Sequence, residues 1–79
     1  MIRYSLHASR RLVERGISPA WVEKAVLQPD WVRPDMDPVL THSFKAISER
    51  EGRILKVVHR RDGEDILIVT LHLDRGAAR

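Results

Sequence analysis

RILKVVHRRDGEDILIVTLHL, at positions 53–73, consists of two runs rich in β-branched residues on either side of a short polar segment. The polar segment contains Asp62 followed by Gly63, and an Asp-Gly pair between two such runs is a common hairpin signal. We therefore predict a β-hairpin, and the rest of the chain is expected to pack around it.

The second run predicts two faces of different chemistry, because successive side chains in a strand point to opposite sides of the sheet. One face would carry Leu67, Val69, Leu71 and Leu73, and the other Ile66, Ile68, Thr70 and His72. A turn with an odd number of residues would add Leu55 and Val57 to the apolar face, whereas an even turn would set Arg53 opposite His72. We favour the odd turn because it gathers the leucines and valines on one side.

Two helices are expected within residues 5–28, where they would form a helical hairpin after an extended lead-in. Ser5 is a suitable N-cap for the first helix, which would end at Gly16. Ser18 followed by proline marks the start of the second helix. That helix must stop near Leu27, because another proline follows two residues later.

The remaining segment, residues 31–74, predicts an antiparallel sheet. A strand is expected from about residue 40 to 48, with Leu40, Phe44 and Ala46 facing the helices and Thr41, Ser43 and Lys45 on the other side. The expected fold is a single α+β domain over residues 1–79, with the two N-terminal helices on one face of a three- to four-stranded antiparallel β-meander. The second face of the sheet would stay open to solvent.

Composition limits the classes of function. Fourteen Lys and Arg against eleven Asp and Glu give a net charge of +3 and a pI near 10.0, a balance that favours nucleic acid or an acidic partner. The absence of cysteine excludes disulfides and thiolate zinc sites. We find no signal-peptide pattern and no apolar run long enough for a bilayer, so we expect a cytoplasmic protein without a membrane partner.

The open face is where we expect function. With the odd turn, it would collect Thr41, Ser43, Lys45, Lys56, Arg60, Thr70 and His72. Such a surface suits a phosphodiester, because Lys and Arg hold phosphate oxygens and His moves protons near neutral pH. The alternative is that this face is simply solvated, as one face of an antiparallel sheet commonly is.

The first helix carries a second candidate group. His7, Arg11 and Arg15 are four residues apart and form one stripe. His7 could be an acid, a base or a phosphate contact, or a helix-start histidine bonded to nearby backbone. The four histidines show neither metal-ligand spacing nor a carboxylate-rich cluster, so we expect no metal and no cofactor.

Several segments together resemble a known family. HASRRLVERGIS at 7–18, FKAI at 44–47, RILKVV at 53–58 and IVTLHLDR at 68–75 resemble the bacterial domain-of-unknown-function 4258 family. Its members are similar to RelE-like and BrnT-like toxin ribonucleases, which implies a helix pair on an antiparallel sheet and a partner antitoxin. The matched positions are His7, Ala8, Arg11, Arg15, Gly16, Ile17, Lys45, Arg53, Val57, Val58, Thr70, Asp74 and Arg75. The sequence departs at His72, where the family favours an aromatic residue.

The leading hypothesis is a toxin-like ribonuclease of a toxin–antitoxin system that cleaves RNA without a metal. A base would take the proton of a ribose 2′-hydroxyl, cations would stabilise the phosphorane, and an acid would protonate the leaving oxygen. The candidate catalytic residues are His7, Arg11, Lys56 and His72, and the candidate substrate-binding residues are Lys45, Arg53, Arg15 and Thr70. Because the first helix is expected over the apolar face, His7 and Arg11 would meet the end of the sheet rather than its open face.

Two other functions fit the same sequence. A non-catalytic basic module that binds nucleic acid or an acidic partner protein needs only charge. A structural core for an assembly could use an exposed strand edge at Trp31–Pro34 for strand addition, and such an edge also suits a homodimer. The expected partners are therefore RNA, an antitoxin protein or a second copy of the chain.

Overall fold

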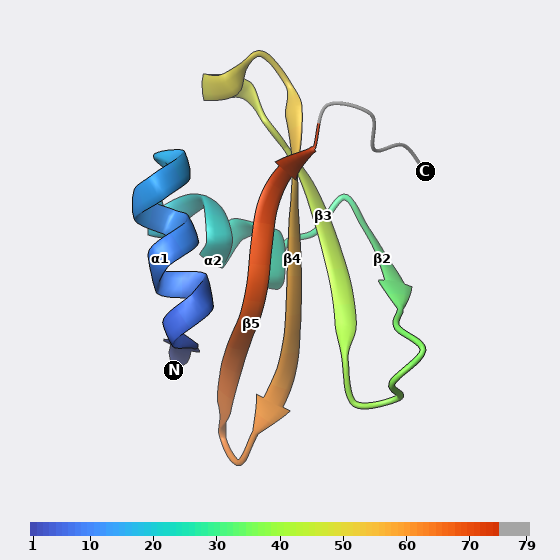
Figure 1. The fold of residues 1–79 in the computed structure, drawn as a ribbon. Coiled ribbons are helices and arrows are strands. Elements are labelled where there is room, and N and C mark those ends of the chain that lie inside the picture. Colours follow the sequence, from blue (N-terminus) through green and yellow to red (C-terminus); the bar gives the residue numbers. More distant parts are fainter. Residues whose placement is uncertain (75–79) are drawn as a thin grey trace.

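The computed structural model describes residues 1–74, with two helices and a mostly antiparallel five-stranded sheet (Figure 1). The elements are β1 (Ile2–Tyr4), α1 (Leu6–Arg15), α2 (Pro19–Leu27), β2 (Trp31–Pro34), β3 (Thr41–Ile47), a short 3-10 turn η1 (Ser48–Arg50), β4 (Arg53–Asp62) and β5 (Asp65–Asp74). The predicted α+β fold is confirmed. Arg75, one of the positions that carry the family resemblance, lies outside the described residues.

The sheet has one strand more than predicted. Its order is β1-β5-β4-β3-β2, so β2 to β5 form the expected meander and β1 is added beside β5. β1 runs parallel to β5, with Ile2 opposite Ile66 and Tyr4 opposite Ile68. The sequence gives little sign of this strand, because three residues are too few for an alternating pattern.

Both helices begin and end at the predicted residues. The Ser5 hydroxyl accepts a hydrogen bond from the Ala8 N–H at 3.0 Å and so caps α1. Gly16 ends α1 in the left-handed conformation, at φ 61°, which glycine adopts without a side-chain clash. The Ser18 hydroxyl caps α2 by accepting a bond from the Ala20 N–H at 3.2 Å.

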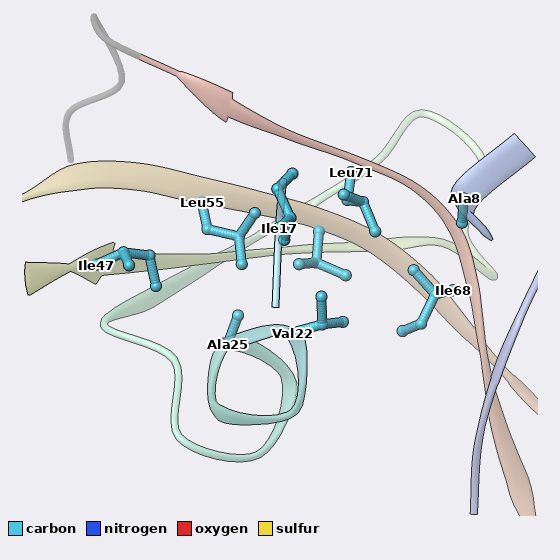
Figure 2. Packing of buried hydrophobic residues seen from close by; sticks show 9 residues of the cluster. Ala8, Ile17, Val22, Ala25, Ile47, Leu55, Ile68 and Leu71 are labelled. Atoms are coloured by element: carbon cyan, nitrogen blue, oxygen red, sulfur yellow. The ribbon is translucent and has the colours of Figure 1, made fainter. Parts of the chain in front are cut away.

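The core lies between the sheet and the helices. In Figure 1, α2 lies behind the strands, and α1 runs alongside β5 at the side of the sheet. Figure 2 shows Val22 and Ala25 of α2 pointing toward Leu55 and Leu71 of the sheet. These side chains are fully buried, and Ala8 joins the same cluster from α1. Both helices therefore bury their apolar sides against one face of the sheet.

The hairpin turn is even, contrary to the prediction. Asp62 pairs with Asp65, which leaves Gly63 and Glu64 as a two-residue turn. Gly63 has φ 64°, as tight hairpin turns require.

The predicted apolar face nevertheless forms, because β5 contains a bulge. Val58 pairs with Thr70 and His59 pairs with Ile68, so Val69 has no partner in this ladder. Beyond the bulge Leu55 stands opposite Leu73, and Val57 opposite Leu71, on the helix side as predicted. Before the bulge the faces are exchanged relative to the prediction, so Ile66 and Ile68 face the helices while Leu67 faces the open side.

The prediction for β3 was wrong by one residue of phase. Ser43 pairs with Val57 and Lys45 with Leu55, so both face the helices, as does Thr41. Phe44 and Ala46 therefore lie on the open side, and Leu40 precedes the strand.

A hydrogen bond explains why a serine takes the inner position of β3. Ser43 is only 1% exposed, and its hydroxyl lies 2.7 Å from Nε2 of His59. Burial lowers the pKa of His59, so a neutral imidazole partners the hydroxyl. A hydroxyl that keeps a hydrogen bond can be buried at little cost, and polarity alone then fails to indicate the face.

Candidate functional site

The side-by-side arrangement of α1 and β5 brings the predicted helix stripe to the edge of the sheet. Ser5 fixes this arrangement, because its N–H donates to the Ile68 carbonyl at 3.0 Å and its hydroxyl to the Val69 carbonyl at 2.8 Å. One turn further on, His7 Nε2 lies 3.0 Å from Thr70 Oγ1. His7 therefore does reach a side chain of the open face, at the β5 edge.

A basic hollow of about 530 Å³ lies at the same seam, beyond His7. We call it the basic hollow, and its lining residues are Arg11, Arg15, Arg50, Arg53, His72 and Leu73. The Arg50 guanidinium donates to the Gly16 carbonyl at 3.5 Å, which ties η1 to the end of α1. The charged groups that line the hollow are thus guanidiniums, which suit an anion with several oxygens.

Two of these guanidiniums retain hydrogen-bonding capacity. The Nε atoms of Arg11 and Arg53 are buried and bond to no acceptor in the described part of the chain. A buried donor without a partner costs free energy, so these two positions would be stabilised by an acceptor placed close enough to reach the Nε atoms.

His72 lies where the hollow meets the open face. Burial lowers its pKa below the ordinary value, and the charges of Lys56 and Arg11 lower it further. Asp74, whose Oδ2 is 3.8 Å from His72 Nε2, opposes this shift only in part. His72 is therefore a neutral imidazole near pH 7, able to accept a proton.

The open face continues from His72 as two cross-strand rows, each made of residues that stand directly opposite one another. The Lys56 row comprises Trp31, Phe44, Lys56 and His72, and the Val58 row comprises Arg33, His42, Val58 and Thr70. In the Lys56 row the rings of Trp31 and Phe44 are stacked, with centroids 4.8 Å apart and planes 5° from parallel.

His42 of the Val58 row pairs with a carboxylate outside the row, and the sequence analysis missed this pair. Nε2 of His42 lies 2.7 Å from Oδ1 of Asp35, in the connection between β2 and β3. The pKa of Asp35 is lowered, first by the backbone N–H of Asp37, then by His42 and by the nearby Lys56. The separation of seven residues between Asp35 and His42 was the only sequence signal for this pair.

A family model described as Domain of unknown function (DUF4258) matches residues 4–72. The chain belongs to the DUF4258 family. No curated protein and no solved structure matches the chain. The predicted family is therefore confirmed, while the similarity to RelE-like and BrnT-like toxins stays a prediction.

Most of the predicted site residues of this DUF4258 domain come together around the α1–β5 seam. The basic hollow contains Arg11, Arg15, Arg53 and His72, while Lys56 stands opposite His72, and Thr70 contacts His7. Arg50 is an addition, since nothing in its local sequence indicates that η1 folds back toward α1.

Lys45 does not belong to this group. It faces the helix side of β3, where its Nζ lies 3.4 Å from Oδ1 of Asp30. Its predicted place on the open face was wrong for the same reason as that of Ser43, the one-residue phase of β3. Lys45 serves as a link between β3 and the segment before β2.

The described residues were also compared with the requirements of a metal site and of a membrane-spanning helix. Within residues 1–74, no group of three or more His, Asp or Glu side chains is arranged to hold a metal ion. The same residues contain no helix that is both long and apolar enough to cross a membrane.

Proposed function

We propose that this chain is a metal-independent ribonuclease that binds an RNA phosphate in the basic hollow, and that it acts as the toxin of a toxin–antitoxin pair. The observation that carries the proposal is the position of His72, a neutral imidazole, at the mouth of a hollow lined by arginines. A base beside a cluster of cations is the combination that cleavage by a ribose 2′-hydroxyl requires.

The chemistry would proceed in one displacement at phosphorus. Neutral His72 takes the proton of the 2′-hydroxyl, the 2′-oxygen forms a bond to phosphorus, and the bond from phosphorus to the 5′-oxygen breaks. A protonated His7 gives its proton to the leaving 5′-oxygen. The products are a 2′,3′-cyclic phosphate and a 5′-hydroxyl.

The placement of His7 beside Thr70, two residues from His72 on the same strand, supports this division of roles. Thr70, which contacts His7, and His72 are alternate residues of β5, so their backbones are about 6.6 Å apart. A phosphate could lie between the two rings. Arg11 and Arg53 would then stabilise the phosphorane through charge-assisted bonds from their guanidiniums.

Lys56 has two tasks in this proposal. Its charge, directly opposite His72 in the ladder, helps to keep that imidazole neutral. It also offers a further cation to a phosphate oxygen. Lys56→Met should therefore weaken the binding of RNA and shift the pH dependence of cleavage to higher pH, because the pKa of His72 would rise.

The test uses end-labelled RNA, free and as ribosome-bound message, with a chelator of divalent cations present throughout. We expect His72→Gln to slow cleavage by about 10²- to 10⁴-fold, the range for loss of a general base. Lys45→Gln is the matched control, because Lys45 lies on the opposite face of the sheet, and it should cleave like the unmodified protein. RNA in which hydrogen replaces the 2′-hydroxyl of the ribose next to the cleaved phosphodiester bond should resist cleavage at that bond.

Three outcomes would overturn the proposal. The first is no cleavage of either form of RNA, and the second is cleavage that requires a divalent cation. The third is full activity in both His72→Gln and His7→Gln when each variant is folded.

The second candidate function is a non-catalytic module that binds nucleic acid or an acidic partner protein. The observation that favours it is the all-cationic charge of the basic hollow, which needs no aligned imidazoles to attract an anion. Such a module would show salt-sensitive association without product. For single-stranded RNA, each phosphate contact would add about 0.7 to the slope of log affinity against log salt.

A further inference from the structure

The basic hollow holds more positive charge than one phosphodiester can balance. Four of its lining residues are arginines, namely Arg11 and Arg15 of α1, Arg50 of η1 and Arg53 of β4. Within residues 1–74, no carboxylate forms an ion pair with any of the four, and no acidic side chain lines the hollow. Like charges held close together raise the free energy of the folded state, so an anion with several charges is favoured over an anion with one.

Two carboxylates that are close to the hollow in sequence are engaged outside it. Glu49, next to Arg50, accepts a hydrogen bond from the Ser48 hydroxyl at 2.9 Å, and Lys24 of α2 lies near it. Asp74 stands at the mouth, with its Oδ2 at 3.8 Å from Nε2 of His72. The positive charge in the interior of the hollow is therefore not offset by these acids.

The cations occupy two levels along α1. Arg11 is close enough to His72 to lower the pKa of that imidazole, so it belongs to the mouth. Arg15 is the last residue of α1, and Arg50 donates to the carbonyl of Gly16 just beyond it. At about 1.5 Å per residue, Arg15 lies about 6 Å further along the helix than Arg11. A single phosphate bound at the mouth would therefore leave the deeper level without an anion.

The lining of the hollow suits directly linked phosphates better than successive nucleotides. The phosphodiesters of a strand are separated by ribose and base, and bases bind to aromatic side chains on which they stack. Among the described lining residues only Leu73 is apolar, and the imidazole of His72 is the only ring. Guanidiniums, in contrast, bind phosphate oxygens through paired hydrogen bonds. The hollow therefore matches an oligophosphate, which is a short chain of linked phosphates.

We infer that the basic hollow is an oligophosphate site, and that it binds the 5′-triphosphate end of RNA. The assignment to RNA rests on the proposed function. The triphosphate reaches the deeper level at Arg15 and Arg50, and the strand leaves the hollow past Arg11 and His72. A free nucleoside triphosphate shares this chemistry, so the experiment compares the two sources.

The first measurement uses inorganic anions and needs no cleavage. Phosphate, pyrophosphate and tripolyphosphate are titrated at constant ionic strength without divalent cations, and binding is followed by the rise in the thermal unfolding midpoint. We expect affinity to increase with the number of linked phosphates. Tripolyphosphate should bind about tenfold more tightly than phosphate or better, since one charge-assisted hydrogen bond is worth that much.

The second measurement uses labelled uridine hexanucleotides whose 2′-hydroxyls are methylated, so that 2′-hydroxyl attack cannot cleave them. They carry a 5′-hydroxyl, a 5′-triphosphate or a 3′-phosphate, and uridine triphosphate and a 5′-hydroxyl decanucleotide of about equal net charge to the 5′-triphosphate probe are added for comparison. We expect the 5′-triphosphate probe to bind about tenfold more tightly than each of the others or better, measured by anisotropy and competition.

Two matched variants locate the site. Arg15→Gln removes a charge from the deeper level and should weaken the 5′-triphosphate probe more than the 5′-hydroxyl probe. Arg61→Gln makes the same change of charge at an exposed position about 26 Å from Arg53 along β4, and it should bind every probe like the unmodified protein. Circular dichroism shows whether each variant is folded.

The outcomes separate this inference from the proposed function. Equal binding of phosphate and tripolyphosphate, or equal losses in Arg15→Gln and Arg61→Gln, would overturn the oligophosphate site and leave the ribonuclease proposal standing. Uridine triphosphate that binds as tightly as the 5′-triphosphate probe would support the oligophosphate site and overturn its assignment to an RNA end. Tight binding of the 5′-triphosphate probe without cleavage of its unmethylated form would support the inference and remove the catalytic proposal. Binding of no probe would overturn both.

Discussion

Replacement of Ser5 by alanine tests how α1 is held against β5. The Ser5 hydroxyl makes two hydrogen bonds, accepting from the Ala8 N–H at 3.0 Å and donating to the Val69 carbonyl at 2.8 Å. Loss of an N-cap costs about 1 kcal/mol, and loss of a second, partly buried hydrogen bond costs about 1 kcal/mol more. We therefore expect Ser5→Ala to lower the free energy of unfolding by about 2 kcal/mol.

Ser18→Ala provides the matched control. The Ser18 hydroxyl caps α2 through the Ala20 N–H at 3.2 Å, in an exposed position. Its replacement should cost about 1 kcal/mol, the cap alone. Urea denaturation followed by circular dichroism measures both values. If Ser5→Ala costs no more than Ser18→Ala, the bond from α1 to the bulge of β5 contributes nothing, and the account of how His7 is positioned fails.

Three further predictions concern the core, the site and a helix end. Leu55→Ala, at a position with 0% exposure, should lower the free energy of unfolding by about 2–5 kcal/mol, whereas Leu27→Ala, at 67% exposure, should change it by about 0.5 kcal/mol or less in denaturant titrations. The pKa of His72 should lie below its ordinary 6.5 in an NMR titration and rise in Lys56→Met. Because the folded-state pKa of His72 is lowered, the unfolded state of the unmodified protein binds this proton more readily than the folded state does. The contribution of His72 to stability is therefore present above about pH 6.5 and declines as the pH falls below that value. A pKa of His72 at or above 6.5 in the folded protein would contradict this. Gly16→Ala, at φ 61° and with space for a Cβ, should cost about 1 kcal/mol through backbone strain alone, measured as a shift in the urea midpoint.

Local signals in the sequence were sufficient for the elements but not for their phase. The caps at Ser5 and Ser18 and the end at Gly16 follow from interactions within a few residues, and the structure has them as predicted. The bulge at Val69 has no local signature in the sequence. A hairpin with an odd turn and a hairpin with an even turn plus this bulge place the same residues around Leu71 on the apolar face, so the sequence could not distinguish the two.

The candidate site was predictable in its residue types more than in its geometry. The four-residue spacing of His7 and Arg11 placed them on one stripe, yet nothing local says that α1 lies beside β5 at the edge of the sheet. That position follows from the bonds of Ser5 to the bulge, which join parts of the chain 64 residues apart. Lys45 was misplaced because the buried partner of Ser43, His59, lies on another strand.

The parallel pairing of β1 with β5 also dictates when the molecule can be completed during synthesis. The three residues of β1 are made before α1, but residues 66–68, with which they pair, are made only after both helices and the three other strands. Until then α1 lacks the strand against which it packs, and His7 cannot contact Thr70. A ribosome would therefore carry an unassembled nascent chain through nearly the whole of this segment, and the basic hollow cannot form until translation has passed it.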